Sequence, residues 1–386
     1  MINLEHLINP NVAEIEISGI RKFFNLVDGH DDIVSLTIGQ PDFHTPNHVK
    51  EKAKEALDLN YTTYTPNAGL LELREAIANF VHTKYNLTYD AAKEIIVTTG
   101  ASQAIDIALR TILEKGDEVI LPGPVYPGYE PLIKLAGGRP IYVDTRENSF
   151  KLTANLIEKY ITEKTKCVIL PYPSNPTGVT LSRGELEEIS RLLANRPIFI
   201  LADEIYSELT YANKHHSIGE FSNVRDQTLI IQGLSKSHSM TGFRLGYLLL
   251  PEAIQKHVLK VHQYSVTCAS SISQHAAIQA LTVGQDDSLH MVEEYKKRKD
   301  YVIKRLNQMG LNVQMPDGAF YVFPKIPEQS ISSFNYCLTL VNEAKLALVP
   351  GDAFSKYGEG HMRLSYAYHQ DVLKEGLDRL EMFINR

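Results

Sequence analysis

Between residues 94 and 250, short apolar segments alternate with segments whose apolar residues recur at helical spacing. The apolar segments, which we interpret as strands, are 95–99, 118–121, 140–144, 166–170, 197–201, 228–231 and 247–250. The helical segments among them are 104–113, 129–135, 154–160 and 183–194. Alternation of apolar strands and amphipathic helices is typical of crossover units, in which helices cover both faces of a parallel sheet. The pattern therefore predicts an α/β region built on a mostly parallel sheet.

The segments on either side of this region follow a different pattern. On the N-terminal side we expect a strand within 33–42 and helices at 47–57 and 70–85. Beyond residue 250 the expected helices are 254–264, 271–281, 287–309, 334–344 and 372–384. The expected strands of that part are 312–314, 318–323, 347–349 and 362–365. We therefore predict a large domain, 45–285, and a smaller α+β domain formed by 1–44 and 286–386.

Composition and charge narrow the class of protein. The chain has 386 residues, a formal charge of -7 and three widely spaced cysteines. The negative charge argues against nucleic acid as a partner, and the cysteine spacing fits neither a disulfide framework nor a zinc site, so we expect no metal. The N-terminal residues do not resemble a secretory signal, and no apolar run approaches the roughly 20 residues needed to cross a membrane. We therefore expect a cytoplasmic protein without a membrane segment.

Small and hydroxylated residues at the start of one helical segment form a candidate anion site. Gly100, Ala101, Ser102 and Gln103 follow the first strand of the α/β region. Backbone N–H groups and the helix dipole attract phosphate groups at such a position. The alternative is an ordinary helix cap made by Ser102. The segment matches neither a Walker loop nor a dinucleotide fingerprint, so nucleotide binding is not indicated.

Two loops at strand ends carry side chains that suit a flat, polar ligand. Tyr126 lies in a proline-rich loop after 118–121, where it can stack on a heterocycle or simply pack within the loop. Asn175 stands before Pro176 in a loop after 166–170, where it can present an amide to a crevice or complete a turn. Ligands of open α/β sheets bind outside the carboxyl ends of the strands, which is where both loops lie.

Charged residues at strand positions need partners. Asp203 follows the apolar strand 197–201, with Tyr206 three residues later, and burial of this carboxylate is costly unless it is paired. The alternative for Asp203 is a helix cap. Arg363 lies inside the strand-like segment 362–365, where its guanidinium would suit a carboxylate ligand or a structural ion pair.

The segment 233–246 joins two apolar strands and contains an unusual set of residues. Lys236 is surrounded by serines, Arg244 follows eight positions later, and glycines stand at both ends. A solvated turn needs none of these residues, whereas a site that binds an anion beside a reactive amine needs all of them. We therefore interpret Lys236 as a nucleophile that forms a Schiff base with an aldehyde.

These candidates form a consistent set. Asn175, Asp203 and Lys236 stand about one crossover unit apart, at the ends of successive strands. A phosphate site, a stacking ring, an acid, a Schiff-base lysine and a carboxylate clamp are the groups that pyridoxal phosphate chemistry requires. The motifs Ser-Asn175-Pro-Thr-Gly, Asp203-Glu-Ile-Tyr206 and Ser235-Lys236-x-x-x-Met-x-Gly-x-Arg244-x-Gly resemble those of the class I/II, fold-type I aminotransferases, and the resemblance covers nearly the whole chain.

The resemblance implies roles around the ring of pyridoxal 5'-phosphate. Lys236, Asp203 and Tyr206 are the implied catalytic residues. Lys236 would bond the cofactor aldehyde, and Asp203 would pair with the pyridine nitrogen. Asn175 and Tyr206 would bind the ring 3′-oxygen, and Tyr126 would stack on the ring.

The resemblance also implies residues for the phosphate and the substrate. The residues implied to hold the phosphate are Ala101, Ser102, Gln103, Ser235 and Arg244, with Tyr64 supplied by the partner subunit of a homodimer. The residues implied to receive the substrate α-carboxylate are Gly39, Asn175 and Arg363.

The substrate is less well defined than the chemistry. Within the family the chain is most similar to bacterial enzymes that act on N-acetyl-L,L-diaminopimelate or on aromatic amino acids. We expect an amino acid donor, with N-acetyl-L,L-diaminopimelate favoured, and 2-oxoglutarate as acceptor in a ping-pong reaction. Alternatives are an aromatic or aspartate aminotransferase, a β-lyase that needs no acceptor, and a non-catalytic cofactor-binding module.

Arg21 is a candidate for a second cation that binds an acidic substrate. The alternative is that it is a surface arginine.

Overall fold

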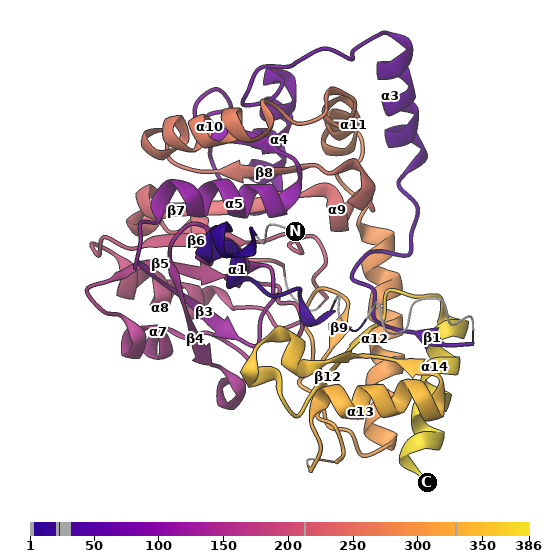
Figure 1. Ribbon diagram of the computed structural model, residues 1–386. Helices are drawn as coiled ribbons and strands as arrows, with labels where there is room; N and C mark the ends of the chain where they lie inside the picture. Colours follow the sequence, from indigo (N-terminus) through magenta and orange to yellow (C-terminus); the bar gives the residue numbers. More distant parts are fainter. Residues whose placement is uncertain (1–3, 21–22, 24–31, 212–213, 329) are drawn as a thin grey trace.

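A seven-stranded sheet forms the centre of the protein. A computed structural model describes residues 4–20, 23, 32–211, 214–328 and 330–386 (Figure 1). The strand order in the sheet is β2-β8-β7-β6-β5-β3-β4. The strands are β2 (Ile95–Thr98), β3 (Glu118–Gly123), β4 (Arg139–Asp144), β5 (Thr165–Leu170), β6 (Phe199–Asp203), β7 (Thr228–Gly233) and β8 (Gly246–Leu249). Strand β8 runs antiparallel to both of its neighbours and the other pairs are parallel, which confirms the predicted mostly parallel sheet.

Helices cover both faces of this sheet (Figure 1). The helices packed on one face are α5 (Gly100–Ile112), α6 (Tyr129–Leu135) and α10 (Glu252–Val266). The helices packed on the other face are α4 (Leu71–Tyr85), α7 (Ala154–Tyr160), α8 (Arg183–Leu193) and α11 (Ser271–Thr282). Successive strand residues alternate between the two cores: Leu201 packs with the α5 face and Ala202 with the α4 face. By the same alternation, Asp203 points to the α5 face and Glu204 to the α4 face.

A smaller α+β unit follows and lies at the lower right of Figure 1, in orange and yellow. Its helices are α12 (Leu289–Gln308), α13 (Ser333–Thr339), which continues as a π-helical turn over Leu340–Ala344, and α14 (Gln370–Ile384). Its antiparallel sheet has the strands β11 (Val349–Pro350), β12 (Met362–Ser365) and β9 (Tyr321–Val322). The N-terminal segment joins this unit because β1 (Val34–Ser35) pairs in parallel with β10 (Leu346–Ala347).

Short elements complete the described chain. The remaining helices are α1 (Pro10–Ala13), α3 (Asn47–Asp58) and α9 (Leu234–Ser237). Turns of 3₁₀ helix are Glu5–Leu7, Arg146–Asn148, Ile218–Glu220, Ser222–Gln227, Thr241–Phe243, Gly351–Phe354 and Lys356–Gly358. None of the helices described is both long enough and apolar enough to span a bilayer.

The predicted strand 312–314 is wrong. The segment is irregular coil between α12 and β9, and the apolar Val313 packs on the core of the smaller unit without strand pairing. Pro316 has no N–H to donate, and the two N–H groups after it both donate to the carbonyl of Gly178, at 2.9 Å. The apolar pattern here therefore indicates burial of Val313 and does not indicate hydrogen bonding to a neighbouring strand.

Candidate active site

A cavity of about 410 Å³ lies at the carboxyl ends of β5, β6 and β7. These three strands are neighbours in the sheet, so the loops after them converge on one place. Eleven of the thirteen predicted site residues line the cavity: Gly39, Ala101, Ser102, Tyr126, Asn175, Asp203, Tyr206, Ser235, Lys236, Arg244 and Arg363. The structure therefore brings most of the predicted set together.

Lys236 extends into this cavity from α9, the helical turn that follows β7. Its Nζ donates a hydrogen bond of 2.6 Å to the carbonyl of Gly39 and lies 5.8 Å from the centre of the Tyr206 ring. Burial, with repulsion from Arg363 and Arg244, lowers the pKa of Lys236 to about 8. A substantial fraction of this amine is thus unprotonated near neutral pH, as a nucleophile or base requires.

Asp203 is a buried carboxylate that faces Lys236 across the cavity. Its Oδ2 accepts a 2.6 Å hydrogen bond from the hydroxyl of Tyr129, and its Oδ1 accepts one of 3.2 Å from the N–H of Ile205. Burial raises the pKa of Asp203, although both hydrogen bonds oppose that rise. A cationic N–H donor placed beside this carboxylate would stabilise its charged form. The sequence assigned no role to Tyr129, whose place in an amphipathic helix marks it only as core.

The start of α5 and the end of the lysine loop form one end of the cavity. Gly100 has φ +78°, and a Cβ placed on it would lie 2.6 Å from the Nη2 of Arg244. The guanidinium thus lies directly against the N-terminus of α5, and its Nη1 donates to the carbonyl of Thr241 at 2.8 Å. Together with the hydroxyls of Ser102 and Ser235, this end can hold a dianionic group.

Arg363 forms the opposite, cationic wall. It lies buried on β12, donates from Nη1 to Asn175 Oδ1 at 2.9 Å and from Nη2 to the carbonyl of Thr37. Its Nε has no hydrogen-bond partner among the described residues. The guanidinium also lies 4.4 Å from the centre of the Tyr321 ring. A buried guanidinium that lines a cavity suits a carboxylate ligand.

Two tyrosines lie between these groups. The hydroxyls of Tyr206 and Tyr321 are 2.9 Å apart, and burial raises the pKa of Tyr206 well above its usual value, so both phenols are neutral and can donate. Tyr321 was missed because a tyrosine in a strand-like apolar segment has the pattern of a core residue. Its contacts with Tyr206 and Arg363, both distant in sequence, reveal its position in the site.

Two of the predicted site residues, Gln103 and Tyr64, do not line the cavity. The side chain of Gln103 accepts a hydrogen bond from the N–H of Thr99 at 2.6 Å and lies outside the cavity lining. Tyr64 is 85% exposed and does not line the cavity of its own chain, so its role in a partner subunit stays a prediction. Arg21 lies outside the described residues.

Comparison with known proteins gives close matches over the full fold. The family model "Aminotransferase class I and II" matches residues 31–380. A protein of Bacillus subtilis (strain 168) described as "Probable N-acetyl-LL-diaminopimelate aminotransferase" is 62% identical over 99% of this chain and 96% of the relative. An aspartate aminotransferase of Pyrococcus abyssi is 43% identical over 97% and 96%. The crystal structure of an aromatic aminotransferase from Pyrococcus horikoshii superposes with a TM-score of 0.89 at 39% identity, over 95% of this chain and 98% of that chain.

Proposed function

This chain belongs to the class I and II aminotransferases and has their fold-type I architecture, and on that basis we propose that it moves the amino group of N-acetyl-L,L-diaminopimelate to 2-oxoglutarate. The observation that carries the proposed chemistry is the meeting of Lys236, Asp203 and Arg363 around one cavity. The proposed donor is supported by the 62% identical relative, whose description names that compound. The acceptor and the two-step, ping-pong order follow from the family resemblance.

The residues of the cavity fit pyridoxal 5'-phosphate. Arg244 lies against Gly100, where any side chain on the glycine would displace the guanidinium. The glycine therefore allows a cation to lie at the N-terminus of α5. Asp203 is a buried carboxylate whose donors among the described residues are neutral, so a pyridinium N–H would be its charged donor. Lys236 supplies an amine of lowered pKa. The phosphate, ring nitrogen and aldehyde would therefore be held by Arg244 with the α5 end, by Asp203 and by Lys236.

Bound pyridoxal phosphate would supply an electron-withdrawing ring that stabilises negative charge on the substrate α-carbon. The protein must then move a proton and orient the substrate. Lys236 is the described amine that lines the cavity, and its pKa of about 8 suits a group that both takes up and returns a proton. Asp203 would place its negative charge beside the ring nitrogen and so stabilise the protonated form of that nitrogen.

Arg363 would orient the amino acid through its α-carboxylate. Its Nη1 is directed by Asn175 and its Nη2 by the carbonyl of Thr37, so the guanidinium is held in place where it lines the cavity. A carboxylate held there would also weaken the repulsion that lowers the pKa of Lys236, since Arg363 is one of the causes of that shift. Substrate binding and base strength are thus coupled through one guanidinium.

Aspartate and aromatic amino acids are the second candidate donors. Relatives at 43% and 42% identity are described as an aspartate aminotransferase and an aromatic-amino-acid aminotransferase.

Homodimer formation with a partner's Tyr64, and a cytoplasmic location, are also proposals drawn from the resemblance.

A half-reaction test separates these donors. The purified protein, saturated with pyridoxal phosphate, is mixed with one amino acid at a time and without a 2-oxo acid, and the visible absorbance is followed. N-acetyl-L,L-diaminopimelate should bleach the absorbance with the highest second-order rate constant, and 2-oxoglutarate should restore it. A higher rate constant with aspartate or phenylalanine would overturn the proposed donor, and release of ammonia and pyruvate from a sulfur amino acid would indicate a β-lyase.

A further inference from the structure

We infer that Glu204 and His215 position the active site from the far face of the sheet, by holding the ends of β6 and β7 in register. The inference rests on the proposed function, because the residues that they position are Asp203 and the Lys236 loop. Neither Glu204 nor His215 lines the cavity that contains Lys236.

Glu204 is a buried carboxylate, only 3% exposed, on the α4 face of the sheet. Its Oε1 accepts a hydrogen bond of 2.7 Å from Ser217 Oγ, and its Oε2 accepts one of 3.0 Å from Gln232 Nε2. The Nε2 of His215 lies 3.1 Å from Oε2, at ion-pair distance, although the ring is not aligned for a hydrogen bond. Within the described chain, His215 is the one basic side chain within 4 Å of this carboxylate.

These contacts connect the strands that carry the reactive groups. Glu204 follows Asp203 directly, and its N–H donates to the carbonyl of Ile231 on β7 at 2.9 Å. Gln232 stands on β7 four residues before Lys236, and its Oε1 accepts a hydrogen bond of 3.1 Å from Tyr247 on β8. One carboxylate thus connects β6 with β7, and through Gln232 with β8.

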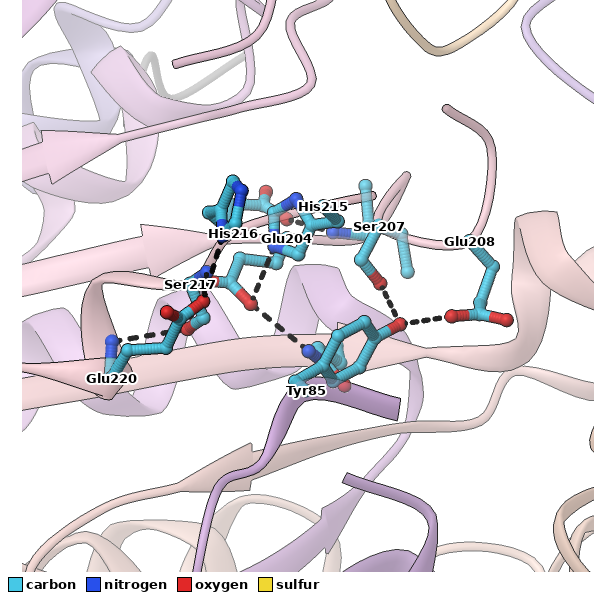
Figure 2. Close-up of polar contacts among 12 residues, drawn as sticks. Tyr85, Glu204, Ser207, Glu208, His215, His216, Ser217 and Glu220 are labelled. Atoms are coloured by element: carbon cyan, nitrogen blue, oxygen red, sulfur yellow. Dashed lines mark hydrogen bonds and ion pairs between the residues drawn. The ribbon is translucent and has the colours of Figure 1, made fainter. Parts of the chain in front are cut away.

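His215 also contacts Tyr85, the last residue of α4 (Figure 2). The ring of Tyr85 meets the ring of His215 edge-on, with centroids 5.6 Å apart and planes at 84°. The Tyr85 hydroxyl donates to Ser207 Oγ at 2.8 Å and to Glu208 Oε1. His215 thus contacts the ring of Tyr85, a contact that does not involve the tyrosine hydroxyl or its bond to Glu208.

The charge of Glu204 also reaches the cavity. Its proximity contributes to the raised pKa of Asp203, after the larger effect of burial. The other titratable groups that face Glu204 are His215, Tyr89 and Tyr247. Neutralising Glu204 should therefore change both the position of Asp203 and the electrostatic potential around it, whereas a purely structural contact would change only stability.

The test compares Glu204→Gln with Glu208→Gln. Both replace a glutamate of the network in Figure 2 with its amide. Glu208, which is partly buried, contacts Tyr85, Lys84 and Ser288 and makes no side-chain contact with β6 or β7 among the described residues. For each variant we would measure kcat and KM, the dissociation constant of pyridoxal phosphate from protein freed of cofactor, and the thermal unfolding midpoint. Small displacements of catalytic groups can cost up to about a hundredfold in rate.

We expect Glu204→Gln to lower kcat about tenfold or more, to leave KM for the donor within about threefold, and to weaken cofactor binding about tenfold. Glu208→Gln should lower only the unfolding midpoint. His215→Gln should shift kcat and cofactor binding in the same direction as Glu204→Gln, and it serves as the test if Glu204→Gln does not fold.

The inference is overturned if the folded Glu204 and His215 variants match Glu208→Gln in kcat and cofactor affinity. Measurements on the unaltered protein distinguish failure of this inference from failure of the proposed function. If the unaltered protein neither binds pyridoxal phosphate nor transaminates, the proposed function fails and the positioning role fails with it. If the unaltered protein does both, failure in the variants rejects only the positioning role.

Discussion

Asp203 and Glu204 are neighbours in sequence but lie in different environments on the two faces of one sheet. Asp203 has one side-chain donor, Tyr129, and faces a cavity that also contains Lys236 and Arg363. Glu204 is contacted by three side chains and faces no part of that cavity. Buried polar groups with incomplete partners mark a place where a ligand is expected, whereas well-partnered ones hold the scaffold.

The cations of the two faces differ in the same way. On the cavity face, Arg363 bonds to the neutral groups of Asn175 and Thr37 and is paired with no carboxylate among the described residues, and Lys236 has a lowered pKa. On the far face, Lys84 lies within 4 Å of two carboxylates, those of Glu208 and Asp286. The cavity face therefore accumulates positive charge that an anionic ligand could neutralise, and the far face does not.

The most severe test of the cavity face is removal of its amine. Lys236→Ala should lower kcat by roughly 10⁴-fold or more, since no other described lysine lines the cavity. Steady-state transamination measures this, with Lys54→Ala on the exposed face of α3 as the matched lysine control. Repeated turnovers by the Lys236 variant at more than a trace rate would show that another group performs the proton transfer.

A large pH effect should follow from the lowered pKa of Lys236. In protein freed of cofactor, capture of pyridoxal phosphate requires the neutral amine, so the rate should rise about tenfold per pH unit up to about pH 8 and then level off. Between pH 6 and pH 8 the rise is about fiftyfold, because half of the amine is already neutral at pH 8. Stopped-flow absorbance would measure it, and a rate that still climbs steeply between pH 9 and pH 10 would contradict the lowered pKa.

Arg363→Lys should lower kcat/KM for the amino donor about tenfold to a hundredfold. The substitution keeps the charge but loses the planar fork, and a hydrogen bond to a charged group contributes about 1.5–3 kcal/mol. The control is Arg305→Lys, because Arg305 pairs with Asp378 away from the cavity and its replacement should change only stability. Equal loss of kcat/KM in both variants would show that Arg363 does not bind the substrate carboxylate.

The smallest effect, and the sharpest comparison of the two faces, comes from two phenols. Tyr129 donates to Asp203 on the cavity face, and Tyr85 donates to Glu208 on the far face. Tyr129→Phe should lower kcat about three- to tenfold, because the pKa of Asp203 rises when this hydrogen bond is lost. Tyr85→Phe should lower the unfolding midpoint and leave kcat unchanged. Identical kinetics in the two variants would mean that the faces do not differ in function.

Local patterns were enough to predict most of the fold. The expected helix 154–160 and strand 362–365 agree with α7 and β12 residue for residue, because each has a short, clear period and defined ends. The convergence of Asn175, Asp203 and Lys236 was predictable because the strands before them were predicted to be parallel neighbours.

Contacts between distant segments could not be predicted in the same way. The hydroxyls of Tyr129 and Tyr321 reach Asp203 and Tyr206 only after packing of separate elements. Glu204 lies within the motif Asp203-Glu-Ile-Tyr206, yet nothing local shows that three segments meet at its carboxylate. The strand expected at 312–314 failed for the opposite reason, since its apolar alternation was present but no neighbouring backbone was available.

The hydrogen bond from Lys236 to the carbonyl of Gly39 has a practical consequence for anyone mapping this enzyme by mutagenesis. The acceptor belongs to the main chain, so side-chain replacements other than that of Lys236 itself would leave the bond possible. A Cβ at residue 39 would lie 2.8 Å from the Tyr321 hydroxyl, and such a variant would report crowding of the tyrosine instead of loss of the bond. Replacing the amide that follows residue 39 with an ester, which weakens that carbonyl as an acceptor, would reveal how strongly the resting lysine is restrained.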